Sequence, residues 1–179
     1  MKSFLELVAA RQSDRVYEPG RVIEREVLGR ILEAGRLAPS ACNGQSWHFT
    51  VVAEPALLAE VGKATSSLGM NKFVKDASAL VLITLEPTNI TSKLGCGIKD
   101  KDFPMMDLGI ASAYITLAAE DEGVGSCILG WFDEKKIKEL VGIPQKKRLM
   151  LIISLGYNTK PKRRKIRKEF DKVVSFEKY

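Results

Sequence analysis

The sequence predicts a mixed fold, α+β or α/β, because helices and strands alternate around two buried strands. Ala79–Leu85 and Leu149–Leu155 are continuous apolar runs, which are typical of strands covered on both faces. Much of the remaining chain carries apolar residues at the 3.6-residue spacing of amphipathic helices. Because no strand is followed by Gly-x-Gly-x-x-Gly, a dinucleotide-binding Rossmann domain is not expected.

The helices are predicted from this spacing together with their start and stop residues. In the second helix Val27, Leu28 and Ile31 share one face, and Pro39 follows its end. Asp107 is expected in the first turn of the central helix, where a negative charge suits the helix dipole. The predicted helices are Ser3–Arg11, Glu24–Leu37, Pro55–Leu68, Asp107–Glu122 and one capped by Asp133 that runs through Val141.

Two further strands and one long loop complete the expected elements. Phe49–Ala53 is a predicted strand, and Val173, Val174 and Phe176 suggest a last short one. Glu86–Pro104 is expected to be a loop, and loops of this length in compact domains are often functional.

Length and composition indicate an ordinary globular protein. The 179 residues suit one domain, residues 1–179, and 45% are hydrophobic. No apolar run approaches the roughly 20 residues of a membrane span. Met1–Glu6 places an acid where a secretory signal would be apolar, so we expect a cytoplasmic protein. Three widely spaced cysteines and one histidine fit neither a disulfide framework nor a metal site.

The positive charge is concentrated in one segment. Lys160–Lys168, called the basic segment below, holds seven basic residues and no acid. Because the net charge is +6, the rest of the chain is left at −1. This distribution argues against a broad nucleic-acid surface, although a basic run can also be a nuclear-localisation or nucleic-acid patch. It equally suits a short phosphate-binding element.

Basic residues alternate at two distant places in the chain. Arg11, Ser13 and Arg15 would point to one side of an extended segment, where they suit a phosphate or an electron-rich ring edge. Lys165 and Arg167 alternate in the same way and could hold the same phosphate from a second side. The competing interpretation of both groups is solvated surface charge.

A turn-like segment, Ala38–Phe49, carries two amide side chains, Asn43 and Gln45. Amides offer donors and acceptors to a planar heterocycle such as a flavin or a base, but the same residue types form ordinary turns. Further on, Gly123–Phe132 contains three glycines around Ile128 and Leu129. It suits either close approach of backbone to a ligand or the start of a glycine-rich strand.

Taken together, these segments resemble the nitroreductase family of FMN-dependent oxidoreductases over nearly the whole chain. Five motifs occur in the family's order. They are Arg-x-Ser-x-Arg-x-Tyr at Arg11–Tyr17, Ala-Pro-Ser-x-x-Asn-x-Gln-x-Trp at Ala38–Trp47, Asp-Leu-Gly-Ile-Ala at Asp107–Ala111, the glycine-rich Gly123–Trp131, and Gly156-Tyr157 followed by basic residues and Val173-Val174.

The resemblance implies an α+β, three-layer fold in which a mostly antiparallel sheet is flanked by helices. It also implies an interlocked homodimer with FMN at the subunit interface. NAD(P)H would reduce the flavin, which would then reduce a nitroaromatic, a quinone or a related small acceptor in a ping-pong mechanism. Flavin N5 would carry the chemistry, so no catalytic side chain is expected.

The resemblance further implies the cofactor-binding residues. Arg11 and Ser13 would bind phosphate and ribityl oxygens, and Arg15 would lie near the pyrimidine edge of the flavin. The remaining predicted residues are Lys165 and Arg167 at the phosphate, Ile128, Leu129 and Gly130 at the ring near N5, and Pro39, Ser40, Asn43 and Gln45, some of them from the partner subunit. Lys162, Arg163 and Arg164 receive no role.

Two positions depart from the family pattern, and three other functions stay open. Ser46 and Asn158 stand where proline is common in the family. The alternatives are a specialised relative (reductive dehalogenase, enoyl reductase or flavin-fragmenting enzyme), a flavin-binding sensor or carrier without turnover, and a nucleic-acid-binding module that uses the basic segment.

Overall fold

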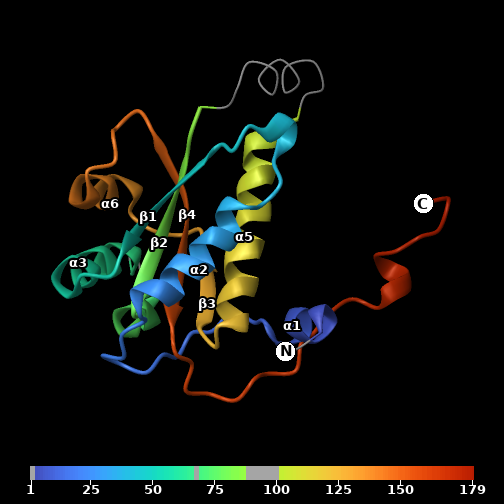
Figure 1. The fold of residues 1–179 in the computed structure, drawn as a ribbon, viewed down its shortest axis with the longest axis horizontal. Coiled ribbons are helices and arrows are strands. Elements are labelled where there is room, and N and C mark those ends of the chain that lie inside the picture. The colour runs from blue at the N-terminus through green and yellow to red at the C-terminus, as the bar shows by residue number, and fades with distance from the viewer. Residues whose placement is uncertain (1–2, 67–68, 88–100) are drawn as a thin grey trace.

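One four-stranded antiparallel sheet, in the order β1-β2-β4-β3, organises the protein (Figure 1). The computed structural model describes residues 3–66, 69–87 and 101–179. The strands are β1 (Trp47–Val52), β2 (Ala79–Leu85), β3 (Gly125–Leu129) and β4 (Arg148–Gly156). The predicted strands Phe49–Ala53, Ala79–Leu85 and Leu149–Leu155 therefore exist as β1, β2 and β4, with ends that shift by at most two residues.

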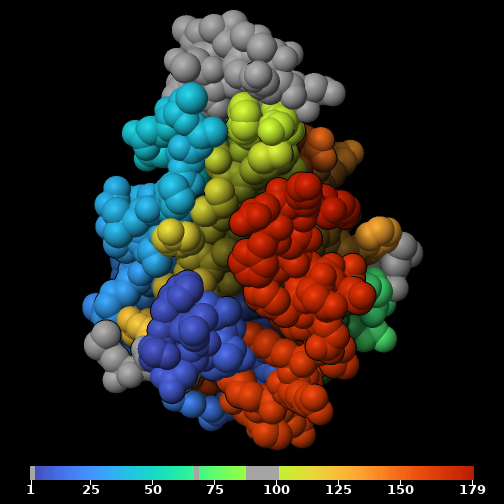
Figure 2. All heavy atoms as spheres, turned by 90° about the vertical axis from the view of Figure 1, so that its right-hand side faces the viewer, coloured from blue at the N-terminus to red at the C-terminus, as the bar shows by residue number. Residues whose placement is uncertain are grey.

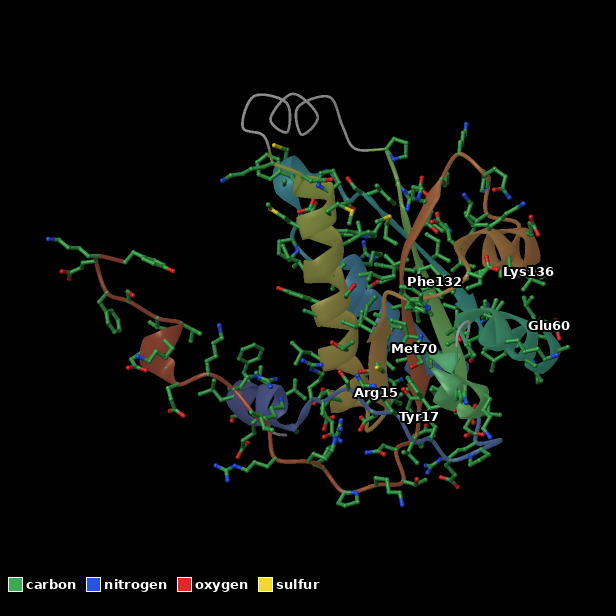
Figure 3. All side chains as sticks on the ribbon, turned by 180° about the vertical axis from the view of Figure 1, so that it is seen from behind. Arg15, Tyr17, Glu60, Met70, Phe132 and Lys136 are labelled. Atoms are coloured by element: carbon green, nitrogen blue, oxygen red, sulfur yellow. The ribbon has the colours of Figure 1, made fainter. Side chains whose placement is uncertain are left out.

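Helices cover both faces of this sheet. The α-helices are α1 (Phe4–Ala10), α2 (Arg25–Arg36), α3 (Pro55–Thr65), α5 (Phe103–Asp121) and α6 (Glu134–Val141). Short 3₁₀ turns are η1 (Ala41–Asn43), η3 (Lys72–Asp76) and η4 (Phe170–Lys172). Helices α2 and α5 lie on one face, while α3 and α6, marked by Glu60 and Lys136, lie on the other (Figure 3). This confirms the α+β, three-layer fold.

Two apolar clusters follow from the side-chain alternation of the buried strands. In β2, Val81 and Ile83 point into the cluster beneath α2 and α5. Leu80 and Leu82 point into the cluster beneath α3 and α6. All four side chains are fully buried, as the continuous apolar run predicted.

Two expectations about elements were wrong, and one open alternative is settled. The strand around Val173 does not form; η4 precedes it, and Val173 is 62% exposed with no described strand beside it. For Gly123–Phe132 the alternative of a glycine-rich strand is confirmed, because the segment contains β3. Helix α5 starts at Phe103, four residues before Asp107, because Asp102 caps it and Pro104 fits its first turn. The predicted Glu86–Pro104 loop lies largely outside the described residues, in the 88–100 gap.

The N-terminal segment Gln12–Tyr17 packs tightly across the ends of β3 and β4. Ser13 forms a parallel bridge with Ser126 at the free edge of β3. The Tyr17 hydroxyl lies 2.9 Å from the Ser154 Oγ and donates to the Asp14 carbonyl at 2.9 Å. Burial raises the pKa of the Tyr17 phenol well above its ordinary value, so it stays protonated as a donor.

Two glycines make this packing possible. Gly125 and Gly156 face each other across the β3–β4 pair. A Cβ on Gly125 would lie 2.9 Å from the Asp14 Oδ2, and one on Gly156 would lie 2.8 Å from the Tyr17 ring. The glycines therefore admit the N-terminal segment to the sheet.

We expect Gly156→Ala to destabilise the protein by about 2 kcal/mol, because overpacking of a filled site costs on that order. Urea unfolding measures the change. Gly29→Ala is the matched control: its Cβ would meet open space on α2, and we expect stabilisation of up to about 1 kcal/mol. If Gly156→Ala were as stable as the native protein, the close approach of Tyr17 would not constrain the fold.

Candidate functional site

A basic cavity of about 440 Å³ lies where the N-terminal segment meets the basic segment. Its described lining residues are Arg11, Gln12, Ser13, Arg15, Arg163, Arg164, Lys165, Ile166 and Arg167. Six of these are cations and none is an acid. Figure 2 shows the N-terminal helix and the C-terminal part of the chain side by side on one face. The structure thus brings together the two groups of basic residues that alternate in the sequence.

A second, mostly apolar cavity of about 420 Å³ adjoins the first. The two share Arg11, Lys165 and Arg167, so a basic end passes directly into an apolar end. Helices α1 and α5 and strand β3 form its walls, with Leu5, Val8, Ala113, Leu117 and Ile128 among the lining residues. A ligand with an anionic group and a flat apolar body would match both ends.

The positive charges around Lys165 suit the binding of an anion. Its Nζ donates to the Val8 carbonyl at 2.5 Å. Burial, followed by the positive charges of Arg11 and Arg167, lowers the pKa of Lys165 below its ordinary value. A bound phosphate would offset the repulsion among these cations, because a nearby anion favours the charged form of each of them.

Strand β3 places its three predicted residues differently. Ile128 is 39% exposed and lines the apolar cavity. Leu129 is only 4% exposed, and its side chain packs in the core beneath α3 and α6, so a ligand could touch only its backbone. Gly130 is exposed, with open space around its Cα. Cys127 is buried, and this burial raises the pKa of its thiol despite the nearby Arg15.

The amide segment lies at the opposite end of α5. The Asp107 carboxylate accepts from the Ala41 N–H at 3.0 and 3.2 Å, which fixes the segment to the helix. The Ser40 Oγ accepts from the Gln45 N–H at 3.0 Å, and the Gln45 amide donates to the Asn43 Oδ1 at 3.1 Å. Both amide side chains are exposed, as is Pro39, whereas Trp47 is buried in the core.

The backbone of the amide segment is strained. Cys42, Asn43 and Gln45 all have positive φ angles, of 50°, 51° and 46°. Non-glycine residues rarely adopt this left-handed region, and such strain concentrates at functional sites. The Ser46 hydroxyl, at the position where the family often has proline, is buried without a hydrogen-bond partner among the described residues. Replacing Ser46 by an apolar residue would therefore break no side-chain hydrogen bond among the described residues.

One chain therefore does not bring all the predicted residues together. Asp107, which holds the amide segment, and Glu120, at the basic end, are thirteen positions apart on α5. At about 1.5 Å per residue they are separated by about 20 Å. In Figure 1 the segment around residue 41 lies at one end of α5 and α1 at the other.

The sequence did not predict the buried acids beside the basic cavity or their pairing with Lys162. Asp14 and Glu120 are 2% and 6% exposed, and Lys162 bonds to both. Side-chain alternation directs Arg11 and Ser13 to one side of the segment and Asp14 to the other. An acid that faces away from the basic residues is the sequence signal that could have predicted a buried partner for Lys162.

Comparisons with known proteins agree on one family. The sequence profile of the nitroreductase family matches residues 8–157. A protein of Archaeoglobus fulgidus, provisionally named NADH dehydrogenase/NAD(P)H nitroreductase, is 34% identical, over 88% of this chain and 86% of its own. The oxygen-insensitive NADPH nitroreductase of Helicobacter acinonychis is 25% identical, over 96% and 95%. Among solved structures, an FMN-dependent nitroreductase from Clostridium difficile has a TM-score of 0.80 at 27% identity, over 98% of this chain and 100% of that chain.

We expect Asp107→Ala to destabilise the protein by about 2 kcal/mol, because it removes a buried acceptor and leaves the Ala41 N–H without its partner. Amide exchange at Ala41 should accelerate at the same time, which NMR measures directly. Asp121→Ala, an exposed carboxylate at the other end of α5, should change the stability by less than about 0.5 kcal/mol. Unchanged exchange at Ala41 would contradict the assigned role of Asp107.

Proposed function

The chain belongs to the nitroreductase family, and on this premise we propose that it is an FMN-dependent oxidoreductase. It would use NAD(P)H to reduce nitroaromatics, quinones or related small electron acceptors. The observation that carries the proposal is the basic cavity that continues into an apolar one, with Arg11, Lys165 and Arg167 shared between them.

The donor set fits FMN. A phosphate monoester carries about −1.5 to −2 charges at neutral pH, and guanidinium groups bind such oxygens in pairs. Arg11, Lys165 and Arg167 would hold the phosphate, and the Ser13 hydroxyl would bond to the ribityl chain. The apolar cavity beside Ile128 would receive one part of the ring system.

A bound FMN would supply the two-electron redox chemistry. The residues of the chain bind and orient it and exclude water from the apolar side. Arg15 would stabilise the negative charge that develops at the pyrimidine edge on reduction, since a fixed cation near developing charge is an effective electrostatic contribution. With water as the proton source, no side chain has to act as a general acid.

We propose that the protein is a homodimer. Helix α5 carries apolar residues on its outer face as well, with Met106, Ile110 and Tyr114 between 37% and 52% exposed. Gly109 and Ala113 on the same face would allow a partner helix to approach closely. Exposed apolar residues also occur on α1 and after the basic segment, at Phe4, Leu5, Phe170 and Phe176. Apolar surface of this extent marks an interaction site.

The dimer would also complete the flavin site. The amide segment and the phosphate-binding cations lie at opposite ends of α5 in one chain, about 20 Å apart along the helix. We therefore propose that Pro39, Ser40, Asn43 and Gln45 serve the FMN whose phosphate the other subunit holds. Residues 1–179 would form one FMN-binding domain, with two such sites per dimer.

The geometry favours this function over a nucleic-acid-binding module. Arg163, Lys165 and Arg167 converge on a cavity that also contains Arg11, whereas a nucleic-acid patch spreads its cations along a face. Within the described ranges, no helix is both long enough and apolar enough to cross a membrane. On composition we propose a cytoplasmic location.

We expect the purified protein to be yellow and to release FMN on denaturation. NADH or NADPH should bleach the bound flavin rapidly, and a quinone, a nitroaromatic or an activated enone should restore the colour. Stopped-flow absorbance measures both half-reactions. Bleaching without reoxidation by any acceptor would favour a sensor or carrier, and a protein that cannot be loaded with FMN would overturn the proposal.

Lys165→Ala and Arg167→Ala should each weaken FMN binding about tenfold, because each removes a charge-assisted bond to the phosphate. Lys168→Ala, on the same segment but outside the cavity lining, is the control with an equal loss of charge. Fluorescence titration with FMN and with riboflavin measures the effect, which should be absent for riboflavin. Equal losses for both flavins would place Lys165 and Arg167 away from the phosphate.

FMN binding should also weaken at alkaline pH. In the protein without ligand, Lys165 loses its charge as the pH rises through its lowered pKa, so the affinity for FMN should begin to fall there. Lys165→Arg should remove this part of the pH dependence, because a guanidinium stays protonated. A native profile that remains flat to the ordinary lysine range would contradict the lowered pKa.

A further inference from the structure

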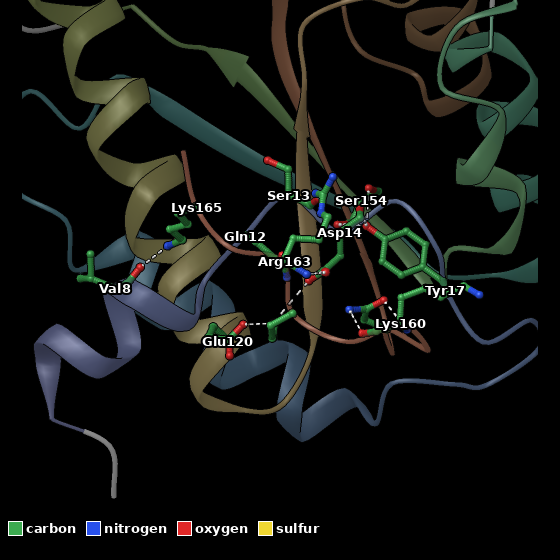
Figure 4. A network of polar contacts seen from close by, with 12 residues as sticks. Val8, Gln12, Ser13, Asp14, Tyr17, Glu120, Ser154, Lys160, Arg163 and Lys165 are labelled. Atoms are coloured by element: carbon green, nitrogen blue, oxygen red, sulfur yellow. Dashed lines mark hydrogen bonds and ion pairs between the residues drawn. The ribbon is translucent and has the colours of Figure 1, made fainter. Parts of the chain in front are cut away.

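Lys162 points away from the cavity toward two buried acids. Its Nζ lies 2.5 Å from the Glu120 Oε2 and 3.7 Å from the Asp14 Oδ2. Glu120 comes from the last turns of α5 and Asp14 from the N-terminal segment (both labelled in Figure 4), so these two ion pairs join the basic segment to two distant parts of the chain. Lys162 itself does not line the basic cavity.

Further bonds hold the basic segment to the same place. The Gln12 amide donates to the Asp14 Oδ1 at 2.7 Å, and its Oε1 accepts from the Arg163 N–H at 3.0 Å. The Arg163 guanidinium donates to the Ser13 carbonyl at 2.8 Å. Lys165 then donates to Val8. The basic segment is therefore held against residues 8–14 along the wall of the basic cavity.

The buried acids explain why Lys162 is held. An ionised carboxylate removed from water is costly unless a cation or hydrogen bonds compensate it. The Asp14 Oδ2 has no hydrogen-bond partner among the described residues, so Lys162 at 3.7 Å is the compensating charge on that side. The pairing is thus worth more than a surface ion pair, even though the Lys162 side chain is 45% exposed.

Anchoring Lys162 limits where the next cations can be. Lys165 follows by three residues and Arg167 by five, so extended backbone reaches about 10 and 17 Å from the anchor. We propose that Lys162 is a positioning residue. Its ion pairs with buried Asp14 and Glu120, together called the latch below, fix the basic segment and hold Lys165 and Arg167 at the phosphate-binding cavity. The identity of the phosphate as that of FMN rests on the proposed function.

The test compares Lys162→Ala with Lys160→Ala in the full-length protein. Both variants remove one positive charge from the same segment, but the Lys160 side chain is exposed and lines neither the basic nor the apolar cavity. Affinities for FMN and riboflavin are measured by fluorescence titration. Limited trypsin cleavage after Arg163, Arg164 and Lys165, followed by mass spectrometry, measures how firmly the segment is held without any flavin.

Loss of the latch should lower the ratio of FMN to riboflavin affinity about tenfold, mainly through FMN. Trypsin cleavage should accelerate in Lys162→Ala and remain native in Lys160→Ala. Lys162→Arg should restore both within about threefold, because a guanidinium can pair with the same carboxylates. Should Lys162→Ala fold poorly, Lys162→Met combined with Glu120→Gln removes one buried charge and should still show the lowered ratio.

Three results would overturn the proposal. Native cleavage in Lys162→Ala would show that Lys162 does not hold the segment. Faster cleavage with an unchanged flavin ratio would show that the latch does not position Lys165 and Arg167. Equal losses for FMN and riboflavin, with reduced thermal stability, would show a purely structural role. A native protein that binds no FMN would overturn the proposed function instead, while the cleavage comparison would still decide whether the latch exists.

Discussion

The close approach of the N-terminal segment to the ends of β3 and β4 is the contact on which the rest of the site depends. Gly125 and Gly156 are opposite each other, and the space that two side chains would fill is taken by Asp14 and the Tyr17 ring. This contact fixes the inward directions of the Asp14 and Tyr17 side chains. With Asp14 directed inward, its neighbours Ser13 and Arg15 are directed to the cavity.

Helix α5 separates the two halves of the proposed flavin site and also connects them. One end holds the amide segment through Asp107, and the other presents Glu120 to the basic segment. Its inner face packs on the sheet through Ile115 and neighbouring residues, and its outer face is apolar and exposed. A helix that is apolar all round belongs in a larger core, so a second copy on that face would both bury it and bring the two halves of the site together.

The sequence predicted what depends on local pattern. Strand β2 matched its apolar run because every residue in it meets core on one face or the other. The strand around Val173 failed because β-branched residues indicate a strand only where a partner strand is available. In the site, the alternation of basic residues correctly predicted that Arg11 and Lys165 lie at one place, since both line the same cavity. The role of Lys162 could not be predicted, since its acidic partners lie 42 and 148 positions away in the chain.

The basic residues of the basic segment have different partners: Lys162 pairs with buried acids, whereas Lys165 and Arg167 line the basic cavity. Asp14 and Glu120 are buried beside the basic segment, where the Lys162 Nζ lies 3.7 Å from the Asp14 Oδ2 and 2.5 Å from the Glu120 Oε2. A cation beside them offsets part of the repulsion that negative charge at this position would exert on a phosphate dianion, and that repulsion is strongest in low-dielectric surroundings. Lys162 offsets this field from the inner side while Lys165 and Arg167 face the cavity. A segment that carried only the two cavity-lining cations would leave these acids without the charge of Lys162, so the additional basic residue serves the buried acids while Lys165 and Arg167 serve the proposed phosphate site.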